Sequence, residues 1–222
     1  MSEMEKPPTK QPGDKVYAVV QAAASALPVV GGPAVAAIMG LIGPKFEQRR
    51  EEWLELLADK ISELESKVEG FADTPMFVTA VLEATSAALK THEREKLGAL
   101  RNAVGNSPLP GAPDDSTQLL FLRFVDELSA LHLKILAILN DPNHSIEKAG
   151  QLNEFGTGLA LLIHHCIPET TEAQEGFLEQ IHRDLQNRGL VMQENFNGAI
   201  IRERATQKRT SPLGENFLKF IS

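Results

Sequence analysis

The sequence contains few of the residues that support redox, catalytic or nucleic-acid chemistry. Its 222 residues include one cysteine, Cys166. An internal disulfide is therefore excluded, and a reduced thiol in the cytoplasm is expected. There is one Trp and one Tyr, and the 30 acids outnumber the 22 Lys and Arg, giving a net charge of -8. This balance argues against bulk binding to nucleic acid or anionic lipid.

Signatures of catalysis and of metal binding are also missing. The sequence has no GxxxxGK[ST], HExxH or GxSxG motif. Gly31 and Gly32 precede Pro33, which lacks the backbone N–H that a phosphate-binding turn would use. His164, His165 and Cys166 are adjacent in the sequence, without the separated pairs of a zinc site. We therefore expect a non-enzymatic protein without catalytic residues, metal or cofactor.

The longest stretch without charge, Val16 to Pro44, contains four glycines and three prolines. Breaks at Pro28 and at Gly31-Gly32-Pro33 leave two halves, each shorter than the roughly 20 residues of a membrane-spanning helix. We predict an apolar helical hairpin over residues 16–44, with its second helix ending at Gly43-Pro44.

Small residues in this hairpin recur at spacings that let helices pack closely, which matters most in lipid. The sequence is compatible with two locations for this hairpin. It inserts into a membrane, or it forms the core or the oligomer interface of a soluble domain. Trp53 follows the run and is either an interfacial anchor or a core residue of an amphipathic helix. The residues predicted for the membrane or oligomer segment are Gly31, Gly32, Ala36, Gly40 and Gly43.

The positions of the remaining prolines, glycines and helix-capping residues predict two helical domains. Residues 1–15 are expected to be a disordered leader, and residues 16–105 a helical domain with further helices at 46–70 and 75–104. The stretch NSPLPGAPDDS, residues 106–116, contains three prolines and is predicted to be a linker. Residues 117–222 form the second domain.

The second domain resembles a winged helix. The resemblance lies in LEQIHRDLQNRGLVMQ, residues 178–193, and TSPLGENFLKFI, residues 210–221. It implies several helices, a β-hairpin and a closing helix. The helix before the predicted hairpin, residues 172–189, has four acids against two bases, which disfavours DNA binding. Any DNA contact would be made by the wing, which is the predicted β-hairpin, through Arg202, Arg204, Lys208 and Arg209.

The whole layout resembles bacterial proteins of the abortive-infection alpha type. The matching stretches are LPVVGGPAVAAIMGLIGPKFEQRREEWLELLADKISELE and EKLGALRNAVGNS. The resemblance implies a phage-defence effector that acts on membranes.

Together these features predict a mostly α-helical protein: a helical N-terminal region with an apolar hairpin, then a winged helix. The predicted function is a non-enzymatic effector that forms homo-oligomers, acts on the lipid of the inner membrane as a pore, and is controlled through its winged helix by a regulatory protein or a nucleotide. The alternative is a soluble, cytoplasmic oligomeric interaction or transcription-regulatory protein.

Overall fold

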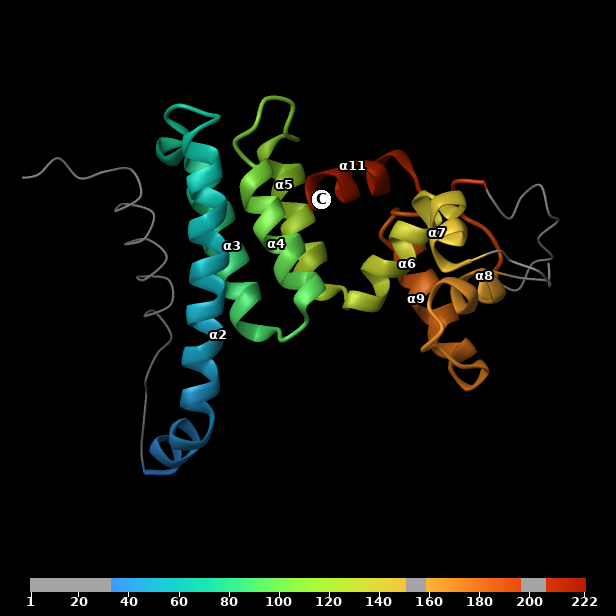
Figure 1. Cartoon of the computed structure of the whole chain (residues 1–222), viewed down its shortest axis with the longest axis horizontal. Coiled ribbons are helices and arrows are strands. Elements are labelled where there is room, and N and C mark those ends of the chain that lie inside the picture. The colour runs from blue at the N-terminus through green and yellow to red at the C-terminus, as the bar shows by residue number, and fades with distance from the viewer. Residues whose placement is uncertain (1–32, 151–158, 197–206) are drawn as a thin grey trace, which may run out of the picture. The chain divides into compact units, whose positions relative to one another are not determined.

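The structure, a computed structural model, describes residues 33–150, 159–196 and 207–222. The chain divides into two compact units. Unit 1 extends to Asp126 and includes Phe220–Ser222, and unit 2 comprises Glu127–Lys219. The described residues are mostly helical, with nine α-helices among them (Figure 1). The predicted helical character is therefore confirmed.

In unit 1 the helices α2 to α5 follow one another up and down, so that α2 and α4 run in the same direction (Figure 1). Helices α2, α3 and α4 pack on one another. The core contains the fully buried side chains of Trp53, Phe77 and Phe121. The elements are α2 (Pro33–Glu65), a 3-10 turn η1 (Phe71–Asp73), α3 (Pro75–Lys90), α4 (Arg94–Asn106) and α5 (Asp115–Glu127).

The last three residues of the chain return to unit 1. Asn106 Nδ2 donates to the carbonyl oxygens of Phe220 and Ser222, at 2.9 and 3.0 Å. The rings of Phe121 and Phe220 lie 5.7 Å apart. These contacts attach the carboxyl end of the chain to α4 and α5.

Unit 2 is a second helical core. The α6 helix begins with a capping box, in which the Ser129 hydroxyl accepts from the backbone N–H of His132. Asp141 caps the following helix by accepting from the backbone N–H of His144. The elements are α6 (Ala130–Asn140), α7 (Pro142–Ala149), α8 (Leu159–Cys166), a 3-10 turn η2 (Glu172–Gln174), α9 (Glu175–Asn187) and α11 (Pro212–Phe220).

The predicted winged helix is wrong, because the described residues contain no strand. The predicted hairpin is reduced there to an isolated antiparallel bridge between Val191 and Thr210. Residues 193–195 are Gln, Glu and Asn, of which Glu and Asn are depleted in strands, so the pairing does not extend in this direction. Residues 197–206, the middle of the predicted hairpin, lie outside the described residues.

The predicted apolar hairpin is also wrong. Its second helix does not end at Gly43-Pro44, because α2 runs without interruption from Pro33 to Glu65. A residue before proline usually avoids helical dihedrals, partly because its Cβ meets the proline ring. Gly43 has no Cβ, so this restriction is relaxed. The first half of the predicted hairpin, residues 16–32, lies outside the described residues.

Two further features differ from the sequence expectations for unit 1. The helix predicted at 75–104 is divided at Thr91, which has extended dihedrals and whose hydroxyl accepts from the backbone N–H of Glu93. This reversal lets α4 pack against α3. Residues 106–116, the predicted linker, lie within unit 1, and they include the last residue of α4, Asn106, and the first two of α5, Asp115 and Ser116.

Candidate functional site

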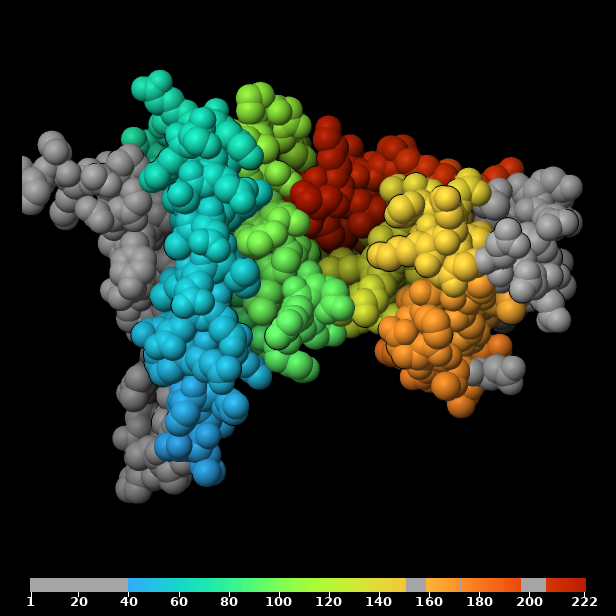
Figure 2. Space-filling model, in the orientation of Figure 1, coloured from blue at the N-terminus to red at the C-terminus, as the bar shows by residue number. Residues whose placement is uncertain are grey.

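The uncharged start of α2, residues 33–43, is the part of the predicted segment that the structure describes. The side chain of Leu41 is 81% exposed and that of Ile42 is 51% exposed. From Gly40 to Glu52 no residue is buried, and this stretch of α2 (blue in Figure 2) lies at the surface. The first buried residue after Gly40 is Trp53. The apolar start of α2 therefore presents aliphatic side chains outside the core of unit 1.

Covering these side chains would be favourable. Full burial of an aliphatic side chain stabilises by roughly 1.5–3 kcal/mol, so covering Leu41 and Ile42 would contribute about 2–4 kcal/mol. Within the described part of the chain, no atom lies within 4 Å of a Cβ built on Gly40 or Gly43. The described residues therefore do not obstruct a close approach to this part of the helix.

The other residues predicted for this segment are only partly described. Ala36 lies in the apolar start of α2, but the surroundings of its side chain are not described. Gly31 and Gly32 lie outside the described residues. Trp53 is fully buried, and its Nε1 donates to Thr85 Oγ1 at 3.0 Å. The indole therefore lies in the core of unit 1, with its polar atom satisfied.

Two of the four predicted wing residues are described, and both form ion pairs inside unit 2. Arg209 is 5% exposed, with its Nε 3.0 Å from Glu194 Oε1. Lys208 Nζ lies 2.9 Å from Glu215 Oε1. Arg202 and Arg204 lie outside the described residues. The two described bases are thus engaged with carboxylates.

Three side chains in unit 2 are of the types found in a hydrolase triad. The Ser129 hydroxyl lies 2.8 Å from His132 Nδ1, and His132 Nε2 lies 3.6 Å from Asp184 Oδ2. The capping box at the start of α6 accounts for the first contact, because the same hydroxyl caps the helix. We therefore interpret this group as a helix cap with a neighbouring carboxylate.

His182, also in unit 2, is buried, with 1% of its surface exposed. Burial, and then the nearby Arg209 guanidinium, lower its pKa to about 4, so that the imidazole is neutral at pH 7. Its ring lies 5.6 Å from that of Phe196. In the described part of the chain, no group of three or more His, Cys, Asp or Glu side chains could hold a metal ion.

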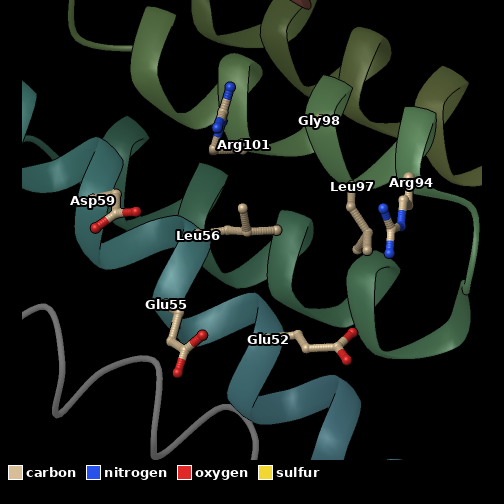
Figure 3. A pocket seen from close by; sticks show the side chains of 8 residues that line it. All are labelled: Glu52, Glu55, Leu56, Asp59, Arg94, Leu97, Gly98 and Arg101. Carbon is tan, nitrogen blue, oxygen red and sulfur yellow. The ribbon is translucent and has the colours of Figure 1, made fainter.

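A groove between α2 and α4, with a volume of about 470 Å³, was not anticipated from the sequence. Figure 3 shows acidic side chains on the α2 side and arginines on the α4 side. Each helix contributes residues at i, i+3, i+4 and i+7, a pattern that could have been read from the sequence. The lining residues are Glu52, Glu55, Leu56 and Asp59 on α2, and Arg94, Leu97, Gly98 and Arg101 on α4.

No family model, curated protein or solved structure matches the chain. Within the described residues, no helix combines the length and the apolar character needed to cross a membrane.

Proposed function

We propose that the chain is a non-catalytic effector of the abortive-infection type, which acts on the inner membrane through the apolar start of α2. The observation that carries the proposal is the exposure of Leu41 and Ile42 at the end of a charge-free helical segment. The kind of effector comes from the sequence resemblance described above. The physical part of the proposal is that this helix end is covered by lipid.

The dimensions of the segment favour insertion as a group rather than singly. Residues 33–43 form about 16 Å of helix, roughly half the hydrocarbon core of a bilayer. Lys45, Arg49 and Arg50 follow directly, and cations at this position are typical of a membrane–water boundary. Because a half-length segment cannot span the bilayer alone, several copies would complete the inserted structure.

The second candidate is an oligomeric interaction protein in which the same helix end packs against a second copy. The open surface at Gly40 and Gly43 favours this alternative, because small residues allow helices to approach closely. The two functions use one surface and differ in what covers it.

The test expresses the full chain in bacteria beside a variant with Leu41→Asp and Ile42→Asp. Both side chains are largely exposed, so the fold should tolerate the change. The matched control is Leu120→Asp, on the surface of α5 in the same unit and 39% exposed. Membrane potential is followed with a dye, and the protein is fractionated between membrane and supernatant.

We expect the wild type and the Leu120 variant to depolarise cells and to appear in the membrane fraction, and the α2 variant to do neither. Depolarisation by all three proteins would contradict the proposal. The second candidate would be supported if the wild type is harmless and stays in the supernatant as an oligomer, and if the α2 variant is no longer oligomeric.

A further inference from the structure

The groove between α2 and α4 has walls of opposite charge that do not neutralise each other. The side chains of Glu55, Asp59 and Arg94 have no hydrogen bond or ion pair with any residue of the described ranges. Within the described ranges, the only hydrogen bond that Glu52 accepts comes from the neutral amide of Gln48, at 2.9 Å. In Figure 3 the carboxylates of α2 and the arginines of α4 lie on the two sides of the groove. Among the described residues, the groove therefore has unpaired charge of both signs.

The shape of the groove suits a helical surface better than a small molecule. Its lining residues span eight residues of each helix, about two turns or 10 Å. Every one of them is exposed or half-buried, whereas a small-molecule site encloses most of its ligand. Leu56 and Leu97 form an apolar strip along the middle, and no described atom lies within 4 Å of a Cβ built on Gly98.

We propose that this groove is the interface of a homodimer, occupied by the same groove of a second copy. A surface with one acidic and one basic wall is complementary to itself under a two-fold rotation. A different protein would need the reverse arrangement of charges, whereas a second copy has it already. The apolar strips of the two copies would meet at the centre, inside a charged rim, which is the usual anatomy of an interface.

Electrostatics also select the orientation of the two copies. Because α2 and α4 run in the same direction, a two-fold axis parallel to the groove places α2 of each copy over α4 of the other. Glu52 then faces Arg94 of the second copy, and the same contact occurs twice. An axis across the groove would instead place α2 over α2, with carboxylates facing carboxylates.

This arrangement has a consequence for the apolar start of α2. In the dimer both α2 helices run in the same direction, so both apolar starts lie at the same end of the assembly. Two copies would thus present these segments to one surface. That consequence rests on the proposed function, whereas the dimer itself does not.

The first experiment reverses one charge on each wall of the full chain, with Glu52→Arg, Arg94→Glu and the two combined. Sedimentation at several protein concentrations gives the dimer dissociation constant. Each single reversal places like charges opposite each other at two symmetric contacts and should raise the constant at least ~10-fold. The combined variant restores opposite charges and should return the constant close to that of the wild type. Circular dichroism checks that each variant is folded.

The second experiment tests the orientation in a Cys166→Ser background. A chain with Glu52→Cys, mixed with a chain with Arg94→Cys, should form a disulfide-linked dimer under mild oxidation. The Glu52→Cys chain alone should form far less, because the two α2 helices do not face each other.

Three results would overturn the dimer. They are a wild type that is monomeric at all concentrations, single reversals that leave the dissociation constant unchanged, and a combined variant that is not restored. Leu41→Asp with Ile42→Asp should leave the dimer intact. Loss of the dimer in that variant alone would assign self-association to the apolar start of α2 instead, whatever the membrane assay gives.

Discussion

Among the glycines that the structure describes, Gly214 is the one at which an added methyl group should be most damaging. It lies in the first turn of α11, and a Cβ built there would be 2.0 Å from the carbonyl oxygen of Leu190 and 2.9 Å from its carbonyl carbon. These are backbone atoms, which cannot rotate away. The same carbonyl accepts from the backbone N–H of Ser211 at 3.0 Å, so a shift would also strain that hydrogen bond.

The magnitude follows from opposing contributions. Alanine is favoured over glycine in a helix by up to about 1 kcal/mol. Overpacking in a filled site costs about 1–3 kcal/mol, and weakening a hydrogen bond adds roughly 0.5–1.5 kcal/mol. We therefore expect Gly214→Ala to destabilise unit 2 by about 1–3 kcal/mol.

Two other glycines provide matched controls. Gly176, in α9 of the same unit, has no described atom within 4 Å of its built Cβ, so Gly176→Ala should be neutral or stabilising. At Gly105 of α4, the Cβ would be 2.1 Å from Lys60 Cε, which belongs to a flexible side chain. We expect Gly105→Ala to cost less than Gly214→Ala.

The assay is urea unfolding followed by far-ultraviolet circular dichroism, which reports on the helices of both units. Fluorescence of the single Trp, which lies in unit 1, is recorded in parallel. Equal stability of the Gly214 and Gly176 variants would contradict this prediction, because it would show that α11 does not lie against Leu190.

Three further predictions concern buried polar groups. Thr85→Val removes the acceptor of the Trp53 indole N–H and should destabilise unit 1 by about 1–3 kcal/mol, measured by Trp fluorescence in urea. Lys96 is buried and its Nζ donates to the carbonyl of Asp126 at 2.9 Å, so Lys96→Met should lower the melting temperature more than Lys90→Met, which removes only an exposed ion pair. The pKa of His182 is about 4 in the folded chain and 6.5 in the unfolded chain. Between pH 4 and pH 6.5 the unfolded chain therefore binds a proton that the folded chain does not. Stability should therefore fall by roughly 1–2 kcal/mol from pH 7 to pH 5, and His182→Leu should remove that part of the pH dependence in urea midpoints.

The helical class and several helix boundaries were determined locally, and the sequence predicts them for that reason. The Asp73-Thr74-Pro75 signal marks the start of α3, where proline occupies the first turn. The amphipathic pattern before Gly189 predicts α9, and Gly189 has the positive φ of 69° that ends such a helix. These features depend on residues close in sequence, so no tertiary information was needed.

The errors arose where tertiary packing or a local compensation outweighed a strong signal. Pro44 predicted a helix end, but Gly43 before it permits helical dihedrals and α2 continues. The break at Thr91 has no glycine or proline to mark it, and it exists where α4 turns back to pack on α3. The predicted β-hairpin needed a partner for each strand residue, and the described residues provide only the bridge between Val191 and Thr210.

Residue order along the chain is enough to predict the composition of the candidate surfaces: a charge-free start of α2, acids along its middle and arginines along α4. Which of these residues are accessible, and which face one another, depends on how the helices pack. The packing buries Trp53 and Arg209, leaves Leu41 exposed, and places Glu52 and Arg94 along one groove. The physical reason is that burial and charge pairing depend on contacts between residues distant in sequence, which periodicity along one helix does not encode.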